Sequence, residues 1–399
     1  MSTPNNTDQY TRFMVGMFDE REVQSSPQAF QAFFGQNAPS RTIFEPDAGT
    51  VEIDILRANG ESLASLVNRG QASADISRGK NTTDQTFTNF VRKWPLIEEE
   101  SNISSDQLLK RLAGDSSFSG RTRLDKNRII AMDLHNDQIR KATRTMEFLA
   151  MTSILTGQMP AILSTANTDL IYDFKRLATH TWAVGNKWDV ANGTALDDID
   201  ASCELIEKDS YMTPNFIGIG DDAMAAFIAD SEQQDLADNR RYDLLEISTA
   251  NPVPAEFARF VKAGWIARGR LRTPRGRVLW IFNNNQRYTN AGGTSTRYMP
   301  SDKAFVLDIN ARMDRYFGPR DSFDPTSDQA AWGQEMFGFN INAAPMPQNV
   351  TAGGIIEPRM FYFDHYRGKG NKVVTLRAQA APIFATTQTD AIVVMTTLV

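Results

Sequence analysis

Residues 122–156 of the chain read TRLDKNRIIAMDLHNDQIRKATRTMEFLAMTSILT, and no proline interrupts them. Apolar side chains recur at steps that alternate near three and four residues, the period of one helix face: Ile129, Met132, Ile139, Ala142, Met146, Leu149 and Ile154. Gly157 and then Pro160 supply the stop signal. At about 1.5 Å per residue this helix would be about 52 Å long, several times the usual helix of about 11–12 residues. A rod of that length suits a thin, extended subunit better than an ordinary globular core.

The apolar stripe of this helix is interrupted by three polar residues: Asn136, Thr143 and Ser153. A coiled coil needs a continuous apolar seam, so we expect the stripe to pack on strands of its own subunit. Three basic residues would then remain for solvent or a neighbour: Arg140, Lys141 and Arg144.

The composition excludes several classes of protein. The 399 residues are 41% hydrophobic and 23% charged, which is typical of a folded, soluble chain of about two or three domains. The net charge of −6 argues against a dedicated nucleic-acid-binding protein. Cys203 is the only cysteine, so no disulfide can form within one chain. Residues 1–6 lack the start of a signal peptide, and no stretch approaches 18 consecutive apolar residues. We therefore expect a cytosolic protein without a transmembrane segment.

The region before the long helix divides into three parts. Residues 1–40 are polar but carry isolated aromatic rings, which indicates an extended arm rather than a fully disordered tail. These rings need a surface to pack on, which a neighbouring subunit could supply: Tyr10, Phe13, Phe18, Phe30, Phe33 and Phe34. Val51, Ile53 and Ile55 alternate with other residues as in a half-exposed strand. Residues 57–89 are polar and long for a compact domain, which predicts a two-stranded loop that reaches away from the body.

The region after the long helix mixes short strands and helices. Residues 161–163 and 169–174 predict a hairpin. Thr194 is the expected N-cap of a helix that runs to about Asp209. A strand over 215–219 and a helix containing Met224, Phe227 and Ile228 should follow. Later strands are expected at 277–282, 304–309, 360–363, 373–376 and 391–395. The mixture predicts an α+β fold.

No motif in the sequence predicts an active site. Gly218–Asp222 lies between a strand and a helix and nearly matches a dinucleotide fingerprint, but its two aspartates oppose a pyrophosphate at the helix start. We interpret those carboxylates as helix caps. His135, His180 and His365 lack metal-ligand spacing, and Cys203 fits a buried, inert thiol. The sequence therefore predicts no catalytic, cofactor-binding or metal-binding residues.

Five arginines form the most distinct charge pattern: Arg268, Arg270, Arg272, Arg275 and Arg277. The first three alternate and should share one strand face, while residues 273–276 resemble a turn. Guanidinium groups suit phosphate, but an acidic patch on a neighbouring subunit or plain solvent would also satisfy them. Because the chain is acidic overall, we favour a protein neighbour or solvent over nucleic acid.

The order of these parts resembles the major capsid proteins of tailed phages, and most closely the lambda-type E family. The likeness is strongest over residues 108–157, where Arg-Ile-Ile at 128–130 opens the run and Met-Thr-Ser-Ile-Leu-Thr-Gly at 151–157 ends it. It returns where Ala-Ala-Pro-Ile at 380–383 precedes Asp-Ala-Ile-Val-Val at 390–394. Between about 179 and 353 the likeness is one of layout.

The resemblance implies an α+β fold of the Hong-Kong-97 type. Its parts would be an N-terminal arm (1–45), an extended E-loop with flanking strands (46–100), a peripheral domain with the spine helix at 122–156 (101–178), an axial domain (179–354) and C-terminal strands (355–399). Some members of this fold cross-link lysine to asparagine between subunits. Lys80 and Asn81 lie in the expected loop, but a solvated lysine is the preferred interpretation.

The resemblance also implies a function. Such subunits form the hexamers and pentamers of an icosahedral shell that encloses double-stranded DNA without sequence-specific binding. They are structural proteins without cofactors, and they assemble in the host bacterial cytoplasm with a scaffolding protein, a portal and sometimes a decoration protein. Because the chain starts with the arm, we expect the scaffold to be a separate protein. The alternative is a nucleic-acid-binding virion protein that uses the hairpin at 268–277.

Overall fold

The computed structural model describes the chain in thirteen segments: 28–35, 40–44, 50–58, 85–104, 123–160, 171–190, 194–229, 245–246, 253–273, 275–289, 293–318, 362–367 and 373–398. Several expectations fall outside these residues. They concern the first 27 residues of the arm, with Tyr10, Phe13 and Phe18, and the middle of the E-loop, with Lys80 and Asn81.

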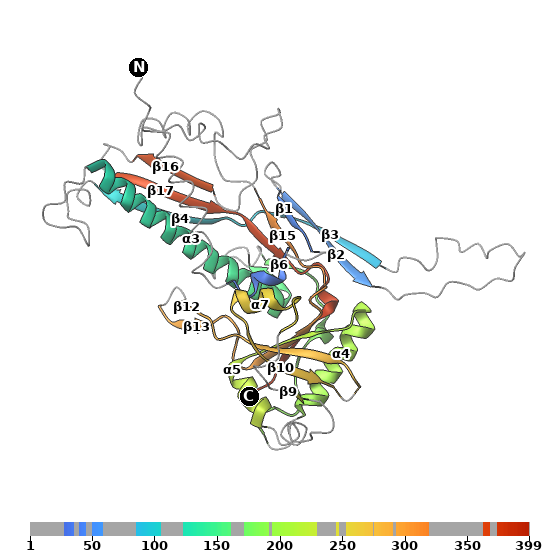
Figure 1. Cartoon of the computed structure of the whole chain (residues 1–399). Helices are drawn as coiled ribbons and strands as arrows, with labels where there is room; N and C mark the ends of the chain where they lie inside the picture. The colour runs from blue at the N-terminus through green and yellow to red at the C-terminus, as the bar shows by residue number, and fades with distance from the viewer. Residues whose placement is uncertain are drawn as a thin grey trace, which may run out of the picture.

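One long helix, α3, runs from Arg123 to Thr156 and has 34 residues, which confirms the predicted rod to within one residue. Figure 1 shows it lying along a sheet at one end of the molecule. The buried members of its stripe include Ile139, Ala142 and Met146. Arg140, Lys141 and Arg144 are exposed, as expected for the face turned away from the sheet.

The sheet beneath α3 joins distant parts of the chain. Its antiparallel strands lie in the order β16 (Tyr362–Arg367), β17 (Val373–Ala380) and β4 (Ile97–Ser104). Gln138 of α3 is fully buried and donates to the carbonyl oxygens of Glu99 (3.2 Å) and Leu376 (2.9 Å). This one amide therefore fixes the helix to two neighbouring strands.

A seven-stranded mixed sheet forms the other half of the molecule (Figure 1). The order of its strands is β7 (Thr181–Ala183), β19 (Ile392–Thr396), β14 (Lys303–Leu307), β8 (Phe216–Ile219), β11 (Val278–Asn283), β10 (Ile266–Arg272) and β9 (Leu245–Glu246). The pairs β8–β11 and β7–β19 are parallel, and the other pairs are antiparallel.

The two faces of this sheet carry two different cores. Because side chains alternate along a strand, Ile217 and Ile219 face one side and Phe216 faces the other. The first side is covered by α4 (Ala195–Ser210) and α5 (Asp221–Ala229). The second is rich in aromatic rings and packs on the short helices α7 (Ala258–Ala263) and η1 (Gln31–Phe33).

Smaller pairings complete the fold. A three-stranded sheet has the order β1 (Thr42–Phe44), β15 (Asp314–Phe317) and β18 (Pro382–Ala385). Three two-stranded units are β2 (Thr50–Ala58) with β3 (Gln85–Lys93), β5 (Gln158–Pro160) with β6 (Ile171–Asp173), and β12 (Arg287–Thr289) with β13 (Ser295–Arg297). Two further short helices are η3 (Ala178–His180) and η5 (Thr389–Ala391).

Two local predictions need correction. The hairpin expected at 161–163 and 169–174 has its second strand, β6, within the predicted range, but the strand that pairs with it is β5 at 158–160, and residues 161–163 lie outside the described part of the chain. Thr194 does precede α4, but its hydroxyl donates to the Asp198 carboxylate (3.3 Å) instead of capping a backbone N–H group. Among the described helices, none is long and apolar enough to cross a membrane.

Candidate functional site

The β2–β3 hairpin projects from one side of the molecule (Figure 1). Its register runs from Thr50 opposite Lys93 to Ala58 opposite Gln85. Val51, Ile53 and Ile55 are fully buried, whereas Glu52 and Asp54 are exposed, which confirms the predicted alternation. In addition, the Leu56 N–H donates to the carbonyl oxygen of Thr387 (2.9 Å). This bond lies two residues before the last described pair, Ala58–Gln85, so β2 is held to the body as far as Leu56.

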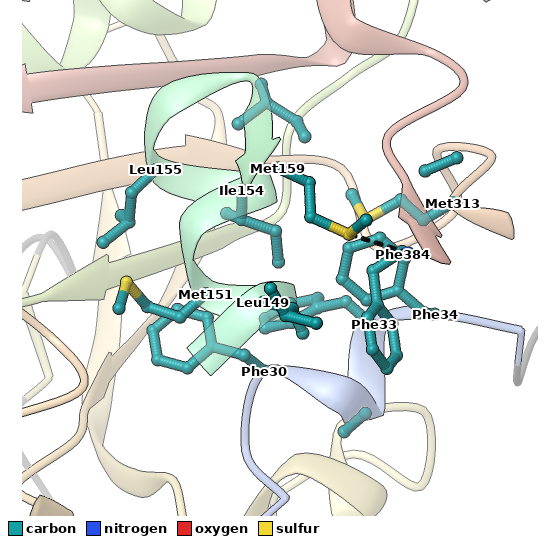
Figure 2. Packing of buried hydrophobic residues seen from close by; sticks show 14 of the residues in the cluster. Phe30, Phe33, Phe34, Leu149, Met151, Ile154, Leu155, Met159, Met313 and Phe384 are labelled. Atoms are coloured by element: carbon teal, nitrogen blue, oxygen red, sulfur yellow. Dashed lines mark hydrogen bonds between the residues drawn. The ribbon is translucent and has the colours of Figure 1, made fainter. Parts of the chain in front are cut away.

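The aromatic residues at 30–34 lie inside their own subunit. Phe30 and Phe34 are fully buried and Phe33 is nearly so. Figure 2 shows these rings against the last turns of α3, near Leu149 and Ile154. The expectation that a neighbouring subunit covers these three rings is therefore wrong. Their surface is supplied by α3 and by the aromatic side of the seven-stranded sheet.

Glu147 of α3 anchors this aromatic segment. Its fully buried carboxylate accepts hydrogen bonds from the backbone N–H groups of Phe30 (2.6 Å) and Gln31 (3.1 Å). The Gln31 amide in turn donates to the carbonyl oxygen of Thr143 (3.1 Å), and the Trp265 indole donates to that of Ala29 (2.8 Å). Burial raises the pKa of Glu147 to about 8, although the N–H groups of Phe30 and Gln31 act in the opposite direction.

Sequence reasoning missed Glu147, although a signal existed. Glu147 follows Thr143 by one helical turn and precedes Ile154 by two, so it lies on the buried stripe of α3. An acid in such a stripe needs partners, because an unpaired buried charge is costly. Its partners come from residues more than 100 positions earlier, which no local pattern reveals.

The five arginines divide into two groups. Arg277 is held by α4 in the same chain, through Glu207 (2.6 and 2.5 Å) and Asp200 (2.6 Å). Arg275 pairs with Glu204 (2.6 Å) and Asp200 (3.0 Å) of the same helix. The hydrogen bonds and charge of Glu207, together with the charge of Asp200, raise the pKa of Arg277. These two guanidinium groups therefore already have acidic partners within the subunit.

The other three arginines lie on β10. Leu271 is buried, whereas Arg270 is partly exposed and Arg272 is exposed, so the alternation places these two arginines on the opposite face from Leu271. Arg268 lies at a bulge between Ala267 and Gly269. Contact between Arg268, Arg270 or Arg272 and a neighbouring subunit or DNA stays a prediction.

The glycine-rich turn before α5 is filled by protein. A side chain on Gly218 would meet the ring of Phe305, and one on Gly220 would meet the carbonyl oxygen of Pro300. The carbonyl oxygen of Ser301 accepts a hydrogen bond from the backbone N–H of Ala223 at the start of the helix (2.9 Å). The turn thus serves close backbone packing and leaves no room for a pyrophosphate. The two aspartates expected at the helix start do lie in the first turn of α5, and both also face Arg297, which is 2.9 Å from Asp221 and 3.9 Å from Asp222.

The remaining candidate residues occupy structural positions. His180 is buried, with one ring nitrogen 2.9 Å from Asp209 and the other 3.1 Å from the carbonyl oxygen of Ile392. His135 contacts the Gln138 side chain (3.0 Å). Cys203 is fully buried, and burial raises the pKa of its thiol to about 12. Within the described residues, no group of three or more His, Cys, Asp or Glu side chains is placed to hold a metal ion.

A long helix laid along a sheet, a projecting hairpin and a second, mixed sheet together define the fold of the protein, an α+β fold of the Hong-Kong-97 type. A protein assigned as the capsid protein of a prophage in Escherichia coli CFT073 has a similar structure, with 13% identity, a TM-score of 0.61 and 99% of each chain covered. The capsid of Ralstonia phage GP4 matches with 12% identity, a TM-score of 0.42 and coverage of 94% of this chain and 92% of that one. A structure from Microbacterium phage Oxtober96 matches with 14% identity, a TM-score of 0.43 and coverage of 93% and 91%.

The sequence itself places the chain in a family. The model of phage major capsid protein E matches residues 61–397, so the chain belongs to the phage major capsid protein E family. A search of curated proteins finds no match. The protein is thus a major capsid protein of a tailed phage, a structural subunit that assembles into the oligomeric shell of the virion. The resemblance inferred from the sequence and the fold that it implies are confirmed.

Proposed function

We propose that the subunit forms the hexamers and pentamers of a closed icosahedral shell around double-stranded DNA and carries no catalytic activity. The observation that carries this proposal is the β2–β3 hairpin, which projects from the body, is bonded to it at Leu56 and has Ala58–Gln85 as its last described pair. An isolated two-stranded hairpin is marginally stable in water, so a hairpin that projects from the body is best stabilised by a second surface. In a shell of identical copies, that surface is supplied by the adjacent subunit.

Shortening the hairpin tests this role. Residues 59–84 are replaced by Asn-Gly, which closes the Ala58–Gln85 pair with a two-residue turn. We expect the variant to keep the unfolding midpoint of the wild type, because the buried residues of β2 remain, and to form no shells. Circular dichroism melting measures the first property, and sedimentation with electron microscopy measures the second.

The matched control applies the same operation to the β12–β13 hairpin. Replacing residues 290–294 by Asn-Gly closes the Thr289–Ser295 pair and should leave both folding and shell formation unchanged. If the β2–β3 variant assembles as well as this control, the hairpin is no assembly element. If it fails to fold, residues 59–84 belong to the core of the subunit.

We expect the shell to need other phage proteins. The proposed partners are a scaffolding protein, a portal and a decoration protein, and the proposed place of assembly is the host bacterial cytoplasm. Expressing the chain with and without its neighbouring phage genes, followed by electron microscopy, tests this expectation. Compact monomers or small dimers under every condition would contradict a self-assembling shell subunit.

We propose that the DNA is enclosed without sequence-specific binding. The net charge of −6 and the engagement of Arg275 and Arg277 with α4 support this view. The alternative, nucleic-acid binding through the hairpin at 268–277, requires salt-dependent DNA affinity of the isolated subunit that is lost when Arg268, Arg270 and Arg272 are replaced.

The domain assignment is also a proposal. We assign α3 with the β16–β17–β4 sheet to the peripheral domain (101–178 with part of 355–399), and the seven-stranded sheet to the axial domain (179–354). Strands β17 and β19 belong to these two different sheets, which supports assigning residues 355–399 to both domains.

A further inference from the structure

Arg259 has an unusual environment for a cation. It lies in α7, and its guanidinium carbon is 4.4 Å from the centre of the Phe260 ring. All three guanidinium nitrogens are shielded from solvent and have no hydrogen-bond partner. Burial alone lowers the pKa of Arg259 to about 10, so the group remains charged at neutral pH. A charge is thus held out of water beside an aromatic face and without a hydrogen-bond acceptor.

Two other largely buried arginines, Arg176 and Arg315, have hydrogen-bond acceptors in the same chain. Arg176 donates to the carbonyl oxygens of Ser153 (3.4 Å) and Ile154 (2.5 Å) at the end of α3 and is attracted by Asp390. Arg315 donates to the Thr42 hydroxyl (2.6 Å). A desolvated guanidinium without such bonds is disfavoured unless a partner arrives from elsewhere.

The position of α7 allows a partner to reach this side chain. Val261 is 42% exposed and Lys262 is exposed as well, so the helix forms part of the molecular surface. Arg259 is itself partly exposed, and its long stem has several rotamers that could turn the guanidinium outward without moving the helix. An arginine beside an exposed apolar residue is typical of the core of a protein–protein interface.

We propose that Arg259 is an intersubunit contact, whose guanidinium leaves the Phe260 ring on assembly and pairs with a carboxylate of a second copy of this chain. A carboxylate is the partner that a guanidinium binds best, through two parallel charge-assisted hydrogen bonds. The chain supplies 48 acidic residues against 42 basic ones, so copies of it offer carboxylates in excess. The inference rests on the proposed shell, in which each subunit meets identical neighbours.

Replacement of Arg259 by an apolar side chain separates an assembly role from a structural one. We expect Arg259→Met to leave the urea midpoint of the unassembled subunit unchanged or higher, because a buried unpaired charge is removed. Shell yield, measured by sedimentation and electron microscopy, should fall at least tenfold. The control Arg176→Met should lower the midpoint, because it removes the bonds to Ser153 and Ile154. A lowered midpoint for Arg259→Met, or a full yield of shells, would overturn the proposal.

A second variant locates the partner. Shells are assembled from Arg259→Lys subunits mixed from ¹⁴N and ¹⁵N cultures and treated with a water-soluble carbodiimide, which joins a lysine amine directly to a carboxylate. We expect an amide from position 259 whose two peptides carry different isotopes. If shells form but that amide is missing or joins only peptides of one isotope, the inference fails while the proposed shell stands. If the wild type forms no shells under any condition, both fail.

Discussion

The carboxyl group of Glu147 joins two parts of the chain that are far apart in sequence. It accepts hydrogen bonds from the N–H groups of Phe30 and Gln31 inside an aromatic core, where the carboxyl group is shielded from solvent. Burial is the dominant effect, and it raises the pKa of this carboxyl group to about 8 from its usual 4.5. The folded subunit therefore binds this proton more tightly than the unfolded chain does.

This difference predicts a pH dependence of stability. A raised folded-state pKa contributes stability that is fully present below about pH 4.5 and is lost as the pH rises through about 8. The contribution is at most about 5 kcal/mol, at about 1.4 kcal/mol per pH unit. In Glu147→Gln the group no longer titrates, so its free energy of unfolding should fall less between pH 5 and pH 8 than that of the wild type.

Urea unfolding at several pH values measures how the free energy of unfolding changes with pH in the wild type and in Glu147→Gln. Comparing the variant with the wild type cancels the titration of the groups that the two proteins share. If the free energy of unfolding changes with pH equally in the two proteins, Glu147 keeps an ordinary pKa in the folded subunit. An exposed acid offers a matched control, since Asp137→Asn should leave the wild-type slope unchanged.

At the scale of elements, α3 depends on polar bonds as well as on its apolar stripe. Gln138 reaches both β4 and β17, and the Ser153 hydroxyl donates to the carbonyl oxygen of Phe384 (2.7 Å). Apolar packing alone would let a long helix slide or rotate on a sheet, because it is non-directional. These bonds fix its position along the strands.

Removal of one such bond should be measurable. Gln138→Leu keeps the size of the side chain but leaves the carbonyl oxygens of Glu99 and Leu376 without this donor. We expect a loss of about 1–3 kcal/mol in the free energy of unfolding, since buried polar groups would lose their partner. Arg140→Gln, two residues away on the exposed face, should change it by less than about 0.5 kcal/mol. Equal effects of the two substitutions would mean that Gln138 does not fix the helix.

The elements that the sequence predicts well are those with strong local signals. The ends of α3 follow from an unbroken helical period and the stop at Gly157, and β2 follows from the alternation of Val51, Ile53 and Ile55. Strand pairing could not be predicted, since β4 pairs with β17, which lies more than 260 residues later. The same limit applies to the candidate site: the acids that hold Arg275 and Arg277 lie about 70 residues away on α4.

At the scale of the whole molecule, the two cores share one seven-stranded sheet. Phe216 and Ile217 are neighbours in β8, yet each belongs to a different core. Loss of the sheet would therefore expose both cores together. We infer that the described body of the subunit unfolds as one cooperative unit, although it has two layers of helices.

The single cysteine makes this prediction easy to test. Cys203 lies on the buried face of α4, in the core between this helix and the sheet, and its thiol reacts with a disulfide reagent only after that core opens. We expect pulsed thiol labelling and far-ultraviolet circular dichroism to give the same urea midpoint. Labelling at lower urea would show that the α4–α5 layer opens first and that the two cores are independent.

Strand β19 lies inside the seven-stranded sheet, between β7 and β14. The ribosome synthesises residues 392–396 after every other strand that the structure describes. The seven-stranded sheet therefore stays incomplete until these residues have been made. Chains released early would lack the strand that ties β7 to the rest. Only subunits made through residue 396 can therefore complete the sheet and acquire the fold that assembly into a shell requires.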